Sequence, residues 1–327
     1  EYEGRLLIVD CGVLFPGENQ PGIDLILPDF SYLKDRMDDI EAIFLTHGHE
    51  DHIGAVPYLL RERSDIRIIG SQLTLAFVAP KLKERRITAP MTQVKAGQIE
   101  KVGPFTLEFV TVNHSIPDSL AVAIKTPAGV ILHTGDFKMD KMPLDGKVTD
   151  LETFARLGKE GVDLFLVDST NADVPGLTVA EKDIYPALKE AIDKTPRRVV
   201  VTSFASHVHR IQQVLTAANE ANRKVAYVGR SMIRNMKLAE DLGSLKVPNG
   251  LVVDYKDIDT FGDKIVLICT GSQGEPLAAL SRIANGDHEI QVGKGDTVVL
   301  ASSLIPGNEK SVYRVINELT RFGAHVV

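Results

Sequence analysis

Three histidines and an aspartate lie within six residues in the stretch "FLTHGHEDHIGA", where His47, His49, Asp51 and His52 follow an apolar run. Imidazole and carboxylate groups are ligands for zinc and other first-row divalent ions. Four ligands so close in sequence cannot all converge on one ion at reasonable bond angles. The motif therefore predicts two ions, each completed by residues from elsewhere in the chain. The alternative is a solvated loop that is merely rich in histidine.

Two distant residues fit as completing ligands. His114 in "VTVNHSIPDS" and Asp136 in "VILHTGDFK" each follow a strand-like run, and a carboxylate can bridge two cations. His133 is predicted to pack near the site or to support a ligand, and Asp10 is predicted to accept a hydrogen bond from a ligand histidine. Gly48 is expected to adopt unusual backbone angles within the loop.

Two further motifs could bind phosphate. "SFASHVHRI" places Ser203, Ser206 and His207 where a helix begins, and backbone N–H groups at a helix start suit a phosphate. The alternative is a serine helix cap with solvent-facing histidines. In "TGSQGEP", Gly271 would let the loop approach a phosphate closely while Ser272 donates to it. The alternative there is a plain tight turn.

The pattern of predicted strands and helices that position these residues differs between the two halves of the chain. The first half is rich in strands, with helices expected at residues 53–63, 74–85 and 151–157. In the second half, strands alternate with helices expected at residues 208–221, 231–242, 276–284 and 309–322, which favours a parallel sheet covered on both faces. The change falls near the Pro/Gly segment 174–178, so 327 residues predict two domains.

Composition narrows the function classes. The chain is 44% hydrophobic and 25% charged, as in ordinary globular proteins, and no apolar run reaches the roughly 20 residues of a membrane span. A net charge of −7 does not by itself indicate nucleic-acid binding. Bound divalent cations or a local basic groove could still make the surface positive where the nucleic acid would bind. Cys11 and Cys269 lie in apolar runs and are expected to be buried thiols, which suits the cytoplasm.

The motifs "THGHEDHIGA", "NHSIPDS" and "HTGDFK" resemble those of the metallo-β-lactamase superfamily, in its nuclease branch with an inserted β-CASP domain. The ribonuclease J family is the best match, through "VDSTNADVPG", "SFASHVHRI", "GRSMIRNM", "TGSQGEPLAAL" and "SSLIPGNE". The resemblance implies an αββα metallo-β-lactamase sandwich with an inserted β-CASP domain of parallel, Rossmann-like α/β type. It implies a metallo-β-lactamase domain at residues 1–175 and a β-CASP domain at 176–325, with 326–327 beginning the return to the first domain.

The resemblance also implies residue roles. His47, His49 and His114 would hold one ion, Asp51 and His52 the second, and Asp136 would bridge them. Asp168 in "LFLVDST", at the end of an apolar strand expected to be buried, would orient a histidine or assist proton transfer. Its alternative role is to cap a turn with Ser169 and Thr170.

For RNA binding, the resemblance implies contacts from Ala205, Ser206 and His207, and "TGSQGEP" contributes Gly271, Ser272 and Gln273 as a candidate pocket. Arg210, Arg230, Arg234 and Lys237 could line the RNA channel. The family's later H-x-S-G-H and H-G-E runs do not occur in these 327 residues. Either the chain continues beyond Val327 and supplies the missing ligand there, or the protein lacks part of the site. We expect the first, because the sequence stops inside an apolar, strand-like segment.

The implied activity is 5′→3′ exonucleolytic cleavage of 5′-monophosphorylated, single-stranded RNA, together with endonuclease activity. The implied cofactors are two divalent ions, with zinc preferred over manganese or magnesium. The implied setting is a cytoplasmic homodimer or homotetramer, with other RNA-decay proteins as possible partners and no membrane. Two alternatives are a small-molecule metallohydrolase, such as a glyoxalase II-like thioesterase, and a non-catalytic RNA-binding scaffold.

Overall fold

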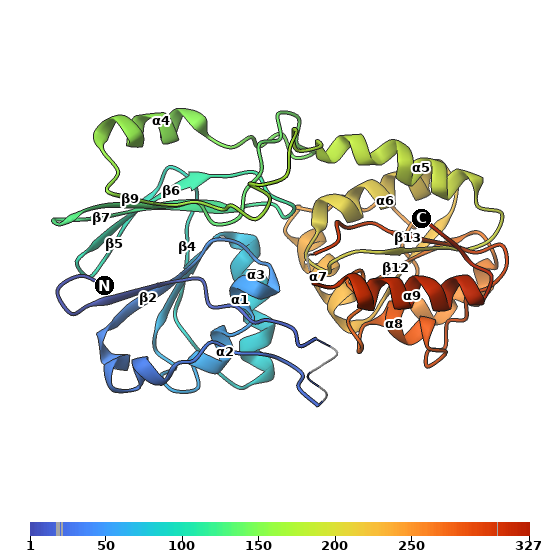
Figure 1. The fold of residues 1–327 in the computed structure, drawn as a ribbon, viewed down its shortest axis with the longest axis horizontal. Coiled ribbons are helices and arrows are strands. Elements are labelled where there is room, and N and C mark those ends of the chain that lie inside the picture. The colour runs from blue at the N-terminus through green and yellow to red at the C-terminus, as the bar shows by residue number, and fades with distance from the viewer. Residues whose placement is uncertain (18–19, 21, 306) are drawn as a thin grey trace. The chain divides into compact units, whose positions relative to one another are not determined.

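The computed structural model describes residues 1–17, 20, 22–305 and 307–327, which form two compact units (Figure 1). The first unit holds residues Glu1–Pro16 and Gly22–Ala180, and the second holds residues Glu181–Val327 together with Gly17 and Gln20. No helix in the described part of the chain combines the length and apolarity that crossing a membrane requires. The domain boundaries of the whole protein stay a prediction.

The first unit is built on two sheets. A parallel sheet has the order β1-β2-β3-β4, and a second sheet has the order β5-β6-β7-β8-β9, antiparallel except for the parallel pair β8 and β9. The strands are β1 (Leu6–Val9), β2 (Ile40–Leu45), β3 (Arg67–Gly70), β4 (Met91–Gln93), β5 (Ile99–Val102), β6 (Phe105–Thr111), β7 (Leu120–Thr126), β8 (Gly129–His133) and β9 (Leu164–Leu166).

The two sheets of the first unit pack face to face. Along β7, Leu120 and Val122 join Phe44 of β2 and Phe109 of β6 in one core, and the Phe44 and Phe109 ring centroids are 5.1 Å apart. Ala121 alternates to the opposite face, as the two-residue period of a strand requires. Both faces of β7 are therefore buried, which accounts for its nearly continuous apolar sequence.

Helices cover the outer faces. The first unit contains α1 (Glu50–Ile53), α2 (Val56–Leu59), α3 (Gln72–Glu84), α4 (Leu151–Glu160) and the 3₁₀ segment η1 (Ser31–Asp39). Leu157 and Phe154 of α4 pack on the face of the second sheet that points away from the first (Figure 1). Ser71 and Asp150 cap α3 and α4 by accepting backbone N–H groups. These layers confirm the predicted αββα sandwich.

The second unit has one parallel sheet with the order β11-β12-β10-β13-β14. Its strands are β10 (Val199–Thr202), β11 (Lys224–Val228), β12 (Ile265–Cys269), β13 (Thr297–Leu300) and β14 (His325–Val326). Its helices are α5 (Tyr185–Lys194), α6 (Val208–Glu220), α7 (Arg230–Asp241), α8 (Ala279–Ala284) and α9 (Glu309–Arg321), with 3₁₀ segments η2 (Glu181–Ile184) and η3 (Tyr255–Phe261). The predicted parallel α/β arrangement is confirmed, and Val326 pairs with Val298 in this sheet.

Some local expectations were wrong. The helix expected at residues 53–63 is two short helices, α1 and α2, and α1 begins at Glu50 inside the histidine motif. The strand β9 before Asp168 was expected to be buried, but its three side chains expose 43–51% of their surface. Helix α5 was not predicted. Cys11 and Cys269 are free and buried, as expected.

Candidate metal centre

The histidine motif starts where a fully buried strand ends. After β2, Thr46 and His47 stay buried, at 1% and 0% exposure. His49 is the N-cap of α1 in an extended conformation, and the first turn of α1 carries Asp51 and His52. The strand end and the helix start therefore present the motif's side chains from one short segment of backbone.

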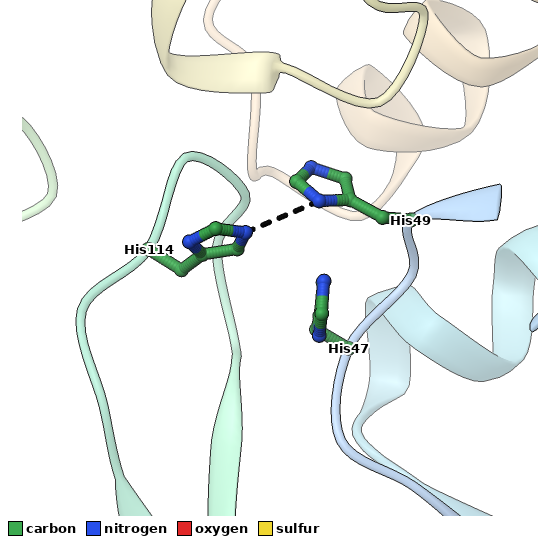
Figure 2. A group of neighbouring side chains, drawn as sticks. All are labelled: His47, His49 and His114. Carbon is green, nitrogen blue, oxygen red and sulfur yellow. Dashed lines mark hydrogen bonds between the residues drawn. The ribbon is translucent and has the colours of Figure 1, made fainter. Parts of the chain in front are cut away.

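Two groups of donor atoms form around this segment. Nitrogens of His47, His49 and His114 lie within 4.8 Å of one another, and so do ligand atoms of His47, His52 and Asp136. Figure 2 shows the first group, in which His47 and His49 come from one segment and His114 from another. His114 Nε2 lies 3.1 Å from His49 Nδ1.

Asp136 lies beside a histidine of each group. Its Oδ2 is 3.4 Å from His52 Nε2 and 3.9 Å from His114 Nε2. Burial works against the charge of Asp136, but the contact with His52 outweighs it and lowers the carboxyl pKa. The carboxylate is therefore ionised, and as a member of the second group it also lies near His114 of the first.

Asp10 determines which nitrogens carry protons. Its Oδ2 accepts the Thr46 hydroxyl proton at 2.8 Å and lies 2.7 Å from His52 Nδ1, while its Oδ1 accepts the Thr46 N–H. Because that hydroxyl proton is committed to Asp10, His47 Nδ1, 3.0 Å from Thr46 Oγ1, must donate to the hydroxyl oxygen. Both His47 and neutral His52 therefore hold Nδ1–H and direct an Nε2 lone pair at the site. Asp10 thus contacts a histidine of the motif, and the role of that histidine as a metal ligand stays a prediction.

The donor set fits a divalent cation. His47 Nε2 is buried and has no hydrogen-bond partner among the described residues. Burial, followed by the neighbouring imidazoles, lowers the pKa of His47 well below its ordinary value, so the ring is neutral. Burial opposes charge on His52 too, but Asp10 and Asp136 outweigh it and raise the pKa of His52 to about 10. A cation binding at His52 therefore displaces a proton.

We expect Asp10→Asn to lower metal affinity by about 10–100-fold, because an amide places an N–H against one of the three donors that Asp10 now accepts. Metal affinity is measured by competition with a chromophoric chelator. The matched control is Asp145→Asn, since Asp145 accepts the Lys147 N–H in an exposed turn. Unchanged affinity in Asp10→Asn contradicts the tautomer assignment.

Three glycines allow the segments to approach. A Cβ at Gly12 would lie 1.5 Å from the Asp51 carbonyl oxygen, and one at Gly135, where φ is +59°, would lie 2.8 Å from Thr46 Cβ. The expectation for Gly48 was wrong, because its φ lies outside the left-handed region. A Cβ there would instead approach Phe77 and Ile116 at 3.1 and 3.2 Å. A larger residue at position 48 would therefore have to displace the Phe77 and Ile116 side chains by a few tenths of an ångström.

The remaining predicted residues of the first unit lie at the edge of the site. Asp51 is 57% exposed, with Oδ2 3.6 Å from His52 Nε2, and it belongs to neither donor group. Asp168 accepts the Thr170 N–H at 2.9 Å and the Phe137 N–H at 3.3 Å. It therefore caps its own turn and also holds the backbone next to Asp136. His133 accepts the Gly135 N–H and lies outside both groups.

Two residues beside the site were missed in the sequence. Thr46 links Asp10 to His47, and Ser115 Oγ lies 3.1 Å from His49 Nε2. The sequence offered one signal for them, since each is a hydroxyl residue directly next to a predicted metal ligand. Residue type alone does not show which hydroxyl faces the cluster.

The second unit brings its two predicted phosphate motifs to one edge. Thr202 pairs with Cys269, so the loops after β10 and β12 leave neighbouring parallel strands at their carboxyl ends. The chain then crosses from β10 to β11 on one side and from β12 to β13 on the other, which marks a topological switch point. Ala205 and Ser206 are half-buried, and His207 is 7% exposed with Nε2 3.6 Å from Glu181 Oε1.

The loop after β12 is more enclosed than expected. Gly271 has φ +112°, and a Cβ there would lie 2.9 Å from Leu280 Cβ. Ser272 and Gln273 expose 3% and 4% of their surface. The Ser272 hydroxyl is buried without a hydrogen-bond partner among the described residues, whereas the Gln273 amide has several.

The basic residues proposed for an RNA channel differ in exposure. Arg210 does not fit that expectation, because it is 8% exposed and its Nε donates to Glu181 Oε1 at 2.8 Å. Lys237 is exposed and pairs with Asp241 at 2.8 Å. Arg230 is exposed and Arg234 is half-buried.

Comparison with known proteins agrees with both units. Residues 1–158 match the model of the metallo-β-lactamase superfamily, and residues 196–319 match that of the ribonuclease J β-CASP domain. A crystal structure of a protein of unknown function from Enterococcus faecalis V583 has a TM-score of 0.66 at 14% identity, covering 100% of this chain and 82% of that one. At that identity the likeness shows the fold alone.

Curated relatives are similar along the whole chain. Ribonuclease J of Mycobacterium tuberculosis (strain CDC 1551 / Oshkosh) is 53% identical over 329 residues, covering 100% of this chain and 59% of the relative. Ribonuclease J of Thermus thermophilus is 44% identical over 335 residues, covering 100% of this chain and 58% of the relative. The chain thus spans about three fifths of the length of these relatives. Both domain models and these relatives agree that the chain is similar, along its whole length, to the ribonuclease J family of the metallo-β-lactamase superfamily.

Proposed function

We propose that this chain forms the metal-binding and RNA-binding part of a ribonuclease that hydrolyses phosphodiester bonds of single-stranded RNA. The observation that carries the proposal is the pair of donor groups around His47, one of imidazoles and one that includes Asp136. When bound there, two divalent cations would lower the pKa of a water molecule and neutralise charge on the phosphate.

The residues have separate parts in this proposal. His47, His49 and His114 hold one ion, His52 and Asp51 hold the second, and Asp136 bridges them. Zinc suits this nitrogen-rich set, and manganese or magnesium are the alternatives. Asp10 keeps both Nε2 lone pairs directed at the ions through the Nδ1 contacts described above.

Asp168 contributes by orientation. Its carboxylate accepts the Phe137 N–H and so holds the turn that carries Asp136. Because it also caps the Thr170 turn, it fixes two backbone segments at once. We also propose that Asp168 assists proton transfer to the leaving oxygen.

The second unit supplies the RNA contacts. The loops carrying Ala205, Ser206 and His207 and carrying Gly271, Ser272 and Gln273 leave one sheet edge, where backbone N–H groups and hydroxyls suit a phosphate. The chain has no tryptophan, so phosphate and 2′-hydroxyl contacts should outweigh base stacking. A seat for a 5′-phosphate would give 5′→3′ exonuclease activity on 5′-monophosphorylated RNA, with endonuclease cleavage where no end is bound.

A cytoplasmic location, a dimeric or tetrameric assembly and contacts with other RNA-decay proteins are further parts of the proposal, and they follow from the family resemblance of the sequence motifs. The β-CASP match favours RNA over a thioester substrate.

The test compares hydrolysis of one RNA sequence carrying either a 5′-monophosphate or a 5′-triphosphate. We expect the full-length protein to degrade the monophosphorylated RNA at least about tenfold faster, as one charge-assisted phosphate contact would allow. We expect His49→Ala to degrade neither. Equal rates for both ends remove the exonuclease proposal, and turnover of a thioester without RNA cleavage removes the ribonuclease proposal.

A further inference from the structure

The Gln273 side chain is fully engaged inside the second unit. Its Oε1 accepts the Ile305 N–H at 2.9 Å and Asn308 Nδ2 at 3.4 Å. Its Nε2 donates to the Ser303 carbonyl at 2.8 Å and lies 3.4 Å from Ser302 Oγ. A primary amide offers two donor and two acceptor positions, and all four are used here. With 4% exposure, the amide has no group left for RNA.

All four partners belong to the loop after β13, which we call the β13 loop and define as residues 301–305, 307 and 308. The loop leaves the sheet beside β10, because Thr202 pairs with Leu300 and the Ala301 N–H donates to the Thr202 carbonyl at 2.9 Å. The Ala301 carbonyl accepts Arg210 Nη1 at 2.5 Å. The start of the loop is thus fixed from β10 and α6, and its remainder is fixed by Gln273.

The outward side of the β13 loop is accessible. Ser303 is exposed and Ser302 is half-buried, while Leu304 and Ile305 are 41% and 45% exposed. Three loops therefore leave neighbouring carboxyl ends of β12, β10 and β13, and Gln273 joins the first of them to the third. Loops at such an edge are where α/β sheets bind ligands.

We propose that Gln273 is a positioning residue and that the β13 loop it holds is a third RNA-binding segment of the second unit. Gln273 itself does not contact RNA. The Ser303 hydroxyl and the loop backbone would contact phosphates or 2′-hydroxyls of single-stranded RNA. This inference rests on the proposed function, and it reassigns one predicted substrate-binding residue of that function.

The test uses the full chain with Gln273→Leu and Gln273→Glu. The leucine variant removes all four hydrogen bonds at similar volume. We expect amide hydrogen exchange in residues 302–305 to accelerate at least tenfold, and the Kd for 5′-monophosphorylated single-stranded RNA to rise about tenfold, as the loss of an ordered contact would allow. Gln212→Leu is the matched control, because the Gln212 amide also pairs with backbone, to Lys246, on an exposed surface.

The glutamate variant distinguishes positioning from general damage. A protonated carboxyl is nearly isosteric with the amide, so its O–H can donate to the Ser303 carbonyl while its other oxygen accepts the Ile305 N–H. RNA affinity relative to the parent chain should therefore recover in Gln273→Glu between about pH 8 and about pH 5, and stay low in Gln273→Leu. Melting temperatures monitor folding throughout.

Each outcome has a separate meaning. Unchanged exchange of the loop in Gln273→Leu overturns the positioning role. Faster exchange with unchanged RNA affinity overturns the RNA-binding role of the β13 loop. If the parent chain binds no RNA, the proposed function fails first, and the RNA-binding role of the loop fails with it.

Discussion

His47→Ala is expected to lower RNA hydrolysis by about a thousandfold, equivalent to about 4 kcal/mol of transition-state stabilisation. His47 is the only residue common to both donor groups found among the described residues, so its loss removes a ligand atom from each. Its Nε2 is buried without a partner there, and an imidazole in that state is available to a cation and to little else. Bound metal is measured by elemental analysis, and hydrolysis by cleavage of a labelled RNA.

The truncation also leaves a small cavity at a position with 0% exposure, so folding must be checked separately. Asp136→Asn serves as a second variant, because it removes the carboxylate charge at almost constant volume. His325→Ala is the control, since His325 lies exposed on the edge strand β14. Full metal content and an unchanged rate in folded His47→Ala protein contradict the proposed centre.

Removal of divalent ions is the second large effect. A chelator should abolish hydrolysis, and added zinc or manganese should restore it with two ions bound per chain. The physical reason is that the imidazoles of His47, His49 and His114 converge on one space, where a divalent cation can accept several nitrogen lone pairs at once. Calorimetric titration of the metal-free chain gives the number of ions.

Metal should also stabilise the fold. At a free metal concentration about 100 times the dissociation constant, binding adds about 2.7 kcal/mol to the free energy of unfolding. We therefore expect a higher melting temperature with metal, and a smaller increase in His47→Ala than in His325→Ala. Hydrolysis that persists after complete removal of metal, verified by elemental analysis, rules out the metal-dependent mechanism.

Local structure was largely predictable from the sequence. Runs such as "AIFLT" and "VVVT" are strands in the structure, and the helices expected at residues 208–221 and 309–322 differ from α6 and α9 by one residue at most. Periodicity was clear there because one face of each helix is buried. It was misleading at residues 53–63, where the apolar run spans the end of α1 and all of α2, and every residue from Ile53 to Leu60 except Tyr58 is buried.

Whether a polar residue of the second unit contacts a ligand or packs inside the protein was less predictable from the sequence. Gln273 lies in a glycine-rich loop and Arg210 lies on a helix start, and both patterns are typical of ligand contacts. The structure instead buries Gln273 against the β13 loop and Arg210 against Glu181. Their partners are 29 or more residues away along the chain, so no local pattern could identify them.

The sequence by itself determined the ligand types, their concentration in one motif and the family, because residue chemistry and short spacings are local properties. Only the tertiary structure decided that Asp10 sets the proton position on His52 directly, across 42 residues of chain, and on His47 through Thr46, which lies 36 residues from Asp10. It also decided that Asp136 lies between the two donor groups. These contacts depend on where β1, β2 and β8 end relative to one another, which strand pairing and face-to-face packing of the two sheets establish and which no single segment encodes.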